Sequence, residues 1–216
     1  MVKSVCHEII QYGAKIAKAL GAFSGGNISA REGGMVWIQP AGFALDEMRA
    51  VDLCGLELKT GRHVRGKNRP SPEADMHLAV YRARPDIVAV FHTHSPWITG
   101  VVSAGKKFRP MFAEFVNDLG RAGSVPYFAP ATGLLNKKIA HFAGNHDTIF
   151  MVNHGMLTMG VNLKQAFFRC VVAEDAAKSL VSASITGRPL FLNRTRVRRI
   201  LSLDAVKHRA KMMEKK

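Results

Sequence analysis

Hydrophobic residues follow two patterns along the chain, short unbroken runs and longer stretches with helical spacing. The runs are too short for helices and rich in β-branched residues, so they predict buried strands. Strands are expected at Met35–Ile38, Leu56–Thr60, Ile87–Phe91 and Thr148–Val152, and an extended segment at Val125–Pro130. Helical spacing, caps and stop residues predict helices at Ser4–Leu20, Leu134–Ala143 and from Asn162 to about Ile185. Because no internal repeat or low-complexity linker interrupts this series, we expect one domain over residues 1–216.

One of the runs leads directly into two histidines. Ile87–Phe91 is followed by His92 and His94, which are two residues apart. Alternate residues of a strand point to the same face, so both imidazoles are expected on one side. Two such imidazoles at the mouth of a buried strand indicate a metal site, with zinc as the first choice. The alternative is a pair of histidines whose ring nitrogens are satisfied by the backbone.

A third histidine follows a second run. Thr148–Val152 ends in Asn153, His154 and Gly155, so His154 can join His92 and His94 if the two strands lie side by side. Three imidazoles with an open fourth position are typical of a catalytic zinc, whereas structural sites are more often closed by cysteines. The sequence has no Cys-x-x-Cys pair for the structural kind.

A further helix is predicted from Pro72 to about Arg84. Ser71 is a good N-cap, and Pro72 is a good first helical residue. Glu73 falls in the first turn, where a glutamate commonly interacts with the helix dipole. Beside a metal the same carboxylate would be a general base, so both interpretations of Glu73 stay open.

Two turns contain glycines, at residues 21–29 and 39–42. In the first, the glycines are followed by Asn27 and Ser29. Backbone N–H groups in such a turn can point at an anion, and a plain connector between a helix and a strand is the alternative.

The composition is typical of a globular protein, with 216 residues of which 47% are hydrophobic. No apolar run is long enough for a membrane span, and the first residues lack the apolar core of a signal peptide. Cys6, Cys54 and Cys170 are widely separated, which predicts reduced thiols and a cytoplasmic location.

The chain is strongly basic, with a formal charge of +15. Residues 194–216 carry nine basic residues against two acidic ones, a net charge of +7. A basic helix is compatible with nucleic-acid binding, but no recognition motif accompanies it. Val197, Ile200, Leu201 and Leu203 instead indicate a docking face. A solvated helix face and a small anionic substrate explain the positive charge better.

Five short motifs occur in the order of the class II aldolase and adducin family. They are Gly26-Asn27-Ile28-Ser29, Pro70-Ser71-Pro72-Glu73, His77-Leu78-Ala79-Val80-Tyr81, His92-Thr93-His94-Ser95 and Asn153-His154-Gly155. Over residues 4 to 192 the chain therefore resembles the enzymatic branch of this family. That branch includes fuculose-phosphate aldolase, ribulose-phosphate epimerases and oxo-tetronate-phosphate decarboxylases.

The resemblance implies a fold, an assembly and a set of site residues. The fold would be α/β, a three-layer α/β/α domain with a central, largely antiparallel sheet, and the assembly a cyclic homotetramer with active sites at subunit interfaces. The long helix and the basic tail would then lie at an interface. The zinc ligands would be His92, His94 and His154, with Glu73 as the acid/base, and the phosphate pocket would include Asn27, Gly42 and Ser71.

Three positions depart from the family pattern. Ala41 stands where a Thr or Ser usually precedes the glycine of the second turn, and Pro72 stands where a second polar residue usually follows Ser71. Proline also removes a backbone N–H donor from a helix N-terminus. Glu114 aligns with the catalytic tyrosine of the aldolases.

These observations predict a lyase that depends on zinc or another divalent transition metal. We expect it to cleave a C–C bond of a small anionic or polyhydroxylated carbonyl compound through an enediolate. Decarboxylation and epimerisation share this intermediate and are the alternatives within the family. A non-catalytic, adducin-like binding module is the alternative from another class, although such a module does not need the three histidines.

Overall fold

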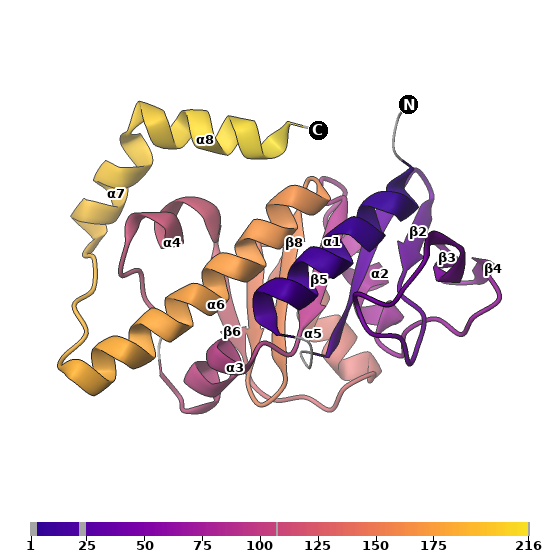
Figure 1. Cartoon of the computed structure of the whole chain (residues 1–216), viewed down its shortest axis with the longest axis horizontal. Helices are drawn as coiled ribbons and strands as arrows, with labels where there is room; N and C mark the ends of the chain where they lie inside the picture. Colours follow the sequence, from indigo (N-terminus) through magenta and orange to yellow (C-terminus); the bar gives the residue numbers. More distant parts are fainter. Residues whose placement is uncertain (1–3, 22–24, 107, 216) are drawn as a thin grey trace.

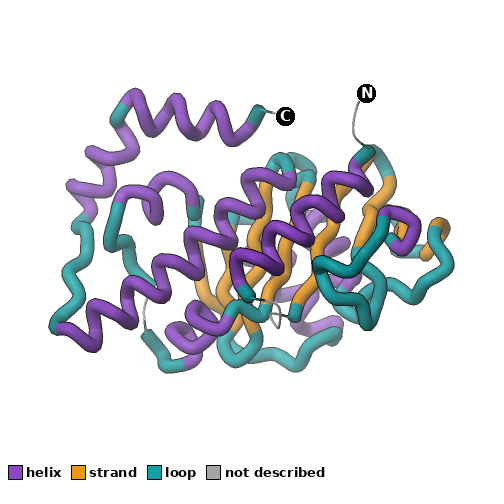
Figure 2. The backbone as a smooth tube through the Cα atoms, viewed as in Figure 1, coloured by secondary structure: helices purple, strands orange, loops and turns teal. Residues whose placement is uncertain are grey.

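One sheet of eight strands runs through the chain, with helices on both sides (Figures 1 and 2). The computed structural model describes residues 4–21, 25–106 and 108–215. The strands are β1 (Gly26–Glu32), β2 (Met35–Ile38), β3 (Cys54–Glu57), β4 (His63–Arg65), β5 (Ala89–Thr93), β6 (Ala122–Val125), β7 (Thr148–Met151) and β8 (Gly155–Gly160). The helices are α1 (Val5–Leu20), α2 (Ala74–Ala83), α3 (Pro96–Ser103), α4 (Ala113–Asp118), α5 (Gly133–Ala143), α6 (Leu163–Thr186), α7 (Arg194–Ser202) and α8 (Asp204–Glu214), with a 3₁₀ turn η1 at Ala50–Asp52.

The strand order in the sheet is β4-β3-β2-β1-β5-β8-β7-β6. Neighbouring strands are antiparallel, apart from the parallel pair of β6 and β7. The expected α/β fold with a largely antiparallel central sheet is confirmed.

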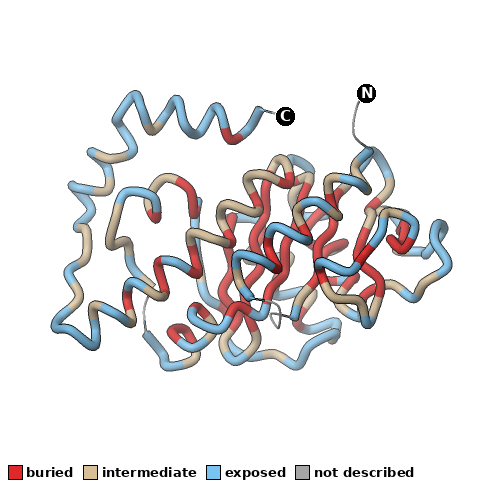
Figure 3. Tube along the Cα trace, in the orientation of Figure 1, coloured by how far each residue is buried: buried red, intermediate tan, exposed pale blue. Residues whose placement is uncertain are grey.

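Two apolar cores lie on the two faces of the sheet. One core joins the sheet to α1, α3, α4 and α6, and includes Ile9, Phe91 and Ala173. The other joins it to α2 and α5, and includes Leu78, Val90 and Ile139. The buried residues therefore follow the strands and the inner sides of the helices, as Figure 3 shows. Within the described ranges, no helix combines the length and the apolar character that a membrane crossing requires.

Most predicted elements are confirmed, and several boundaries differ. Asn162 caps α6 as predicted, because its side chain accepts a hydrogen bond from the backbone N–H of Gln165. The strand expected at Ile87–Phe91 begins and ends two residues later, so His92 lies inside β5. The strand expected at Leu56–Thr60 is instead Cys54–Glu57.

The two strands that precede the histidines do not lie side by side, although this was the arrangement considered for bringing the three rings together. β5 and β7 are separated by β8, which is antiparallel to both. β8 returns directly after the turn that carries His154, and its first residues pair with the end of β5. The turn between β7 and β8, rather than an adjacent strand, therefore brings His154 beside β5.

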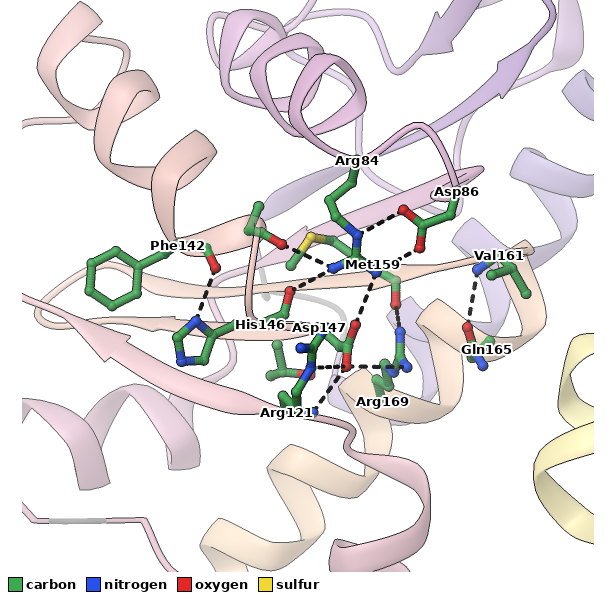
Figure 4. A network of polar contacts seen from close by, with 12 residues as sticks. Arg84, Asp86, Arg121, Phe142, His146, Asp147, Met159, Val161, Gln165 and Arg169 are labelled. Carbon is green, nitrogen blue, oxygen red and sulfur yellow. Dashed lines mark hydrogen bonds and ion pairs between the residues drawn. The ribbon is translucent and has the colours of Figure 1, made fainter. Parts of the chain in front are cut away.

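Helix α2 is anchored at its C-terminal end by a polar cluster (Figure 4). The Arg84 guanidinium donates to both carboxylate oxygens of Asp86, at 2.8 and 2.7 Å. It also donates to the backbone carbonyls of Ala143 and His146, at 3.0 and 3.3 Å, and lies 3.3 Å from Asp147. One side chain thus joins the ends of α2 and α5 to the start of β7.

The basic tail forms two helices, where a single helix from about residue 194 was predicted. They meet at Leu203, and no residue of α7 is buried. Leu201 and Leu203 remain 48% and 49% exposed, whereas Val197 and Ile200 are partly buried and α7 contacts α4, so the predicted docking face is covered only in part. The Arg209 guanidinium donates to Asp118 at 2.7 Å and attaches α8 to the end of α4.

Candidate metal centre

Three separate elements direct four side chains to one point on the α2 side of the sheet. His92 and His94 come from the end of β5, and His154 comes from the turn between β7 and β8. Glu73 immediately precedes α2 as its N-cap residue. The helix begins two residues later than predicted, at Ala74, because Ser71 and Pro72 form a turn before it.

The donor atoms of these side chains are within reach of a single ion. His92 Nε2 lies 3.0 Å from His94 Nε2 and 3.2 Å from one Glu73 oxygen. The other Glu73 oxygen lies 3.1 Å from His154 Nε2. All four ligand atoms are within 4.8 Å of one another.

These separations fit a tetrahedral metal. Zinc ligands lie about 2.0–2.1 Å from the ion, so the donors at the corners of a tetrahedron are about 3.3 Å apart. The distances of 3.0, 3.1 and 3.2 Å are close to that edge length. The Glu73 carboxylate lies beside the three imidazoles, with one oxygen near His92 and the other near His154.

A second layer of hydrogen bonds orients the cluster. His92 Nδ1 is 2.9 Å from the backbone carbonyl of Met156, which can only accept, so the N–H is on Nδ1 and the Nε2 lone pair faces the cluster. The Asn27 side-chain amide donates to Glu73 at 3.0 Å. Strand pairing places Asn27 directly opposite His92, so one pair of strands sets both contacts.

The electrostatics of the cluster favour an ionised Glu73 carboxylate and a neutral His94 ring. Burial raises the pKa of Glu73, but the close contacts with His154 and His92 and the hydrogen bond from the Asn27 amide outweigh burial and hold this pKa well below its usual range. Burial and the neighbouring His92 lower the pKa of His94 to about 4. Neutral imidazoles and a carboxylate are the protonation states in which these groups bind a cation.

Two glycines allow the close approach of the strands, a feature that the sequence analysis did not identify. Gly26 has a φ of 139°, and a Cβ there would collide with the carbonyl of His92. A Cβ on Gly155 would collide with the carbonyl of Thr93 and lie 3.2 Å from the His94 ring. Only the absence of a side chain at both positions lets β1 and β8 pair with β5 around the cluster. The Asn-His-Gly order at 153–155 was the available signal.

The expected phosphate-pocket residues lie at different distances from the cluster. Ser71 accepts a hydrogen bond from the Glu73 backbone N–H at 3.3 Å, and Asn27 contacts the Glu73 carboxylate. Gly42, with a φ of 79°, lies in the turn after Pro40, which is bridged to Pro70. The first glycine-containing turn includes residues 22–24, which are outside the described ranges.

Glu114 is not brought to the cluster within the described chain. It is exposed on α4, which packs against the opposite face of the sheet.

Comparisons with known proteins agree on one family. The family model described as "Class II Aldolase and Adducin N-terminal domain" matches residues 7–181. A 5-deoxy-D-ribulose 1-phosphate aldolase of Bacillus thuringiensis serovar kurstaki is 35% identical over 192 residues, which are 86% of this chain and 88% of that protein. A 3-oxo-tetronate 4-phosphate decarboxylase of Pectobacterium atrosepticum is 28% identical over 178 residues, 79% of this chain and 81% of that protein.

A solved structure is similar over nearly the whole chain. It is an L-fuculose 1-phosphate aldolase with a TM-score of 0.84 and 26% identity, and the match covers 93% of this chain and 96% of that one.

Proposed function

Because the chain belongs to the class II aldolase and adducin family, we propose that it is a metal-dependent lyase that cleaves a C–C bond of a small sugar phosphate or hydroxy-carbonyl compound. The observation that carries this proposal is the convergence of three imidazoles and one carboxylate on a single point. An adducin-like binding module has no need for such a cluster.

The proposed ligands of the ion, zinc or another divalent transition metal, are His92, His94 and His154. All three offer a ring nitrogen toward the same point, which supports this assignment. When bound, the metal would act as a Lewis acid and stabilise the negative charge of an enediolate formed from the substrate. His94 is exposed, so the cluster is open to solvent on that side.

Glu73 is the proposed acid/base. In a retro-aldol cleavage its carboxylate would take the proton of the substrate hydroxyl as the C–C bond breaks, and the electron pair of that bond would form the enediolate. The same carboxyl group would then return the proton to carbon. The depressed pKa of Glu73 keeps the group ionised, which is the state that a general base needs before the first step.

The proposed substrate is anionic. Ser71 and Asn27 lie next to Glu73, and with Gly42 they form the proposed phosphate pocket. Ala41 and Pro72 supply fewer donors there than the family pattern does, whereas the charge of +15 attracts an anion from solution.

Decarboxylation of a β-keto acid is the second candidate. It is supported by the 28% identical oxo-tetronate-phosphate decarboxylase, and it would need the same cluster to stabilise the same enediolate.

We also propose a homo-oligomer, with a tetramer as the first choice, in a reducing cytoplasmic setting. The long α6 and the half-exposed leucines of the tail support an interface, and three free cysteines support the setting. Light scattering after size exclusion gives the mass of the assembly.

A metal analysis joined to a substrate screen tests the proposal. The purified protein is analysed by mass spectrometry for divalent metals and assayed with L-fuculose 1-phosphate, 5-deoxy-D-ribulose 1-phosphate and 3-oxo-tetronate 4-phosphate. Aldehyde release indicates an aldolase, and carbon dioxide release indicates a decarboxylase. We expect about one metal ion per chain and turnover of at least one compound.

Variants separate the roles of the residues. His154→Ala should lose the metal, and Glu73→Gln should keep the metal and lose turnover by about 10²–10⁴-fold. His208→Ala is the matched control, because His208 is exposed on α8. A wild-type protein without bound metal, or full turnover by Glu73→Gln, would contradict the assignment.

A further inference from the structure

Three alternate residues of β1 contact the segment from Glu73 to Pro85, which contains α2. Asn27 donates to Glu73 at 3.0 Å, the Ser29 hydroxyl is 2.7 Å from His77 Nδ1, and the Arg31 guanidinium donates to the carbonyl of Pro85. The Ser29 hydroxyl is also 2.8 Å from the Tyr81 hydroxyl. We call these contacts the β1–α2 ladder.

The spacing of the ladder follows from the geometry of the two elements. Two residues of a strand rise about 6.6 Å, and four residues of a helix rise about 6.0 Å. Asn27 and Ser29 are therefore in step with Glu73 and His77, which are four residues apart, whereas Arg31 contacts Pro85 beyond the end of α2. A shift of the helix along the strand would break all the contacts at once, so the ladder fixes the position of Glu73 along β1. Since β1 also carries Asn27 opposite His92, the ladder fixes Glu73 relative to the cluster.

The central part of the ladder is fully buried. Ser29 and His77 have no exposed surface and Tyr81 is 1% exposed, in a layer whose other members are apolar. One arrangement gives both hydroxyl hydrogens an acceptor: Tyr81 donates to Ser29, and Ser29 donates to His77 Nδ1. The proton of the neutral His77 ring is then on Nε2. Burial, with a smaller contribution from His92, lowers the pKa of His77 to about 3, so the ring is neutral at physiological pH.

A buried polar chain is costly where apolar residues would fill the same space. His77 Nε2 has no hydrogen-bond partner among the described residues, so the ring is not completely satisfied by the protein. His77 lies about one helical turn after Glu73, so the energetic cost of burying its ring is linked to the placement of Glu73 in the cluster.

We propose that His77, locked by Ser29 and Tyr81, is a positioning residue that holds the Glu73 carboxylate in register with the three imidazoles. This inference rests on the proposed metal-dependent function. His77 acts through the placement of α2 and does not itself contact substrate or metal.

A double-mutant cycle tests the proposal, with Zn²⁺ affinity measured by competition against a chelator. The variants are His77→Leu, His77→Asn, Glu73→Gln and the double variant of His77→Leu with Glu73→Gln. Leucine keeps the volume and removes the ring nitrogens, whereas the asparagine amide can occupy the place of Nδ1 beside Ser29. Thr148→Val is the matched control, since Thr148 is equally buried and hydrogen-bonded, to the carbonyl of Leu119 at 2.8 Å, at the other end of the sheet.

If His77 acts through Glu73, His77→Leu weakens Zn²⁺ binding about tenfold in the wild-type background. It has no effect in the Glu73→Gln background, because Glu73→Gln keeps the metal but has already lost the attraction of the carboxylate for the ion. His77→Asn recovers most of the loss, and Thr148→Val binds Zn²⁺ like the wild type. With a substrate that the wild type turns over, His77→Leu lowers kcat by about 10–100-fold and leaves KM nearly unchanged.

Equal losses in both Glu73 backgrounds would show that His77 has only a structural role and would overturn the proposal. So would wild-type affinity in His77→Leu. If the wild-type protein binds no divalent metal, both the proposed function and this inference are refuted. If the His77 variants bind the metal normally, only the inference is refuted.

Discussion

Replacing Arg84 by methionine should destabilise the protein by about 3–4 kcal/mol. The Asp86 pair is half-exposed and contributes about 1 kcal/mol. The hydrogen bonds to the carbonyls of Ala143 and His146 contribute about 1 kcal/mol each. The remainder comes from Asp147, which is largely buried and would lose one of its cationic partners. Methionine keeps the apolar stem of the arginine, so no cavity adds to this loss.

Urea unfolding followed by circular dichroism measures this difference. For a chain of this length the change corresponds to a fall of roughly 10 °C in the melting temperature. Arg62→Met is the control, since the Arg62 side chain is 74% exposed and its carboxylate partner is 3.9 Å away. A loss of stability below about 1 kcal/mol for Arg84→Met would refute this prediction. It would mean that the contacts of Arg84 in Figure 4 are hardly more favourable than the interactions of the same groups with water in the unfolded chain.

The pH dependence gives an independent check. The hydrogen bond from Arg84 holds the pKa of Asp86 below its usual value. Burial raises the pKa of Asp147, but Arg169, the backbone of Arg121 and Arg84 outweigh burial and lower it. A depressed carboxyl pKa contributes stability that is present above the unfolded pKa of about 3.9 and is lost as the pH falls through the folded pKa. The difference in the free energy of unfolding between the wild type and Arg84→Met should therefore become smaller below about pH 4.

Three further predictions concern single side chains. Gly155→Ala should weaken Zn²⁺ binding at least about tenfold, because the new Cβ collides with the Thr93 carbonyl; unchanged affinity in a chelator competition would contradict this. Burial raises the pKa of Cys170 to about 12, so a thiol reagent at pH 8 should label the half-buried Cys6 in the native protein and all the cysteines only in denaturant; native labelling of Cys170, located by peptide mass spectrometry, would argue against that packing. Burial also raises the pKa of Glu174, despite two backbone N–H donors from the start of α3. As the pH rises from about 4.3 through that pKa, the wild type should therefore lose stability relative to Glu174→Gln, which lacks the titrating group; a stability difference between the two proteins that does not change with pH would refute this.

The sequence predicted the donors of the candidate site better than it predicted their arrangement. The two-residue spacing of His92 and His94 is a local property of a strand, so their common side could be predicted. The place of His154 depends on β8, whose residues Gly155–Gly160 show neither alternation nor an apolar run and gave no strand signal. Direct contact between β5 and β7 was the only arrangement considered, and the three rings meet through β8 instead.

Helix boundaries were predictable where a cap residue acts locally, as at Asn162, and less so where tertiary contacts decide. Ser71 was predicted as the N-cap of α2, but its hydroxyl accepts from Glu73 in a preceding turn. The burial of His77 could not be inferred either, because it depends on the pairing of β1 with α2, two segments that are far apart along the chain.

The three imidazoles differ in their exposure to water, so the cluster has a buried side and a solvent-facing side. His92 is fully buried, Glu73 and His154 are partly buried and His94 is exposed, so the cluster faces solvent mainly on the His94 side. Under the proposed function, a metal ion and a substrate that both used this side would share one route. A substrate in place would then slow the escape of the ion, and the protein would retain its metal longer during turnover than at rest.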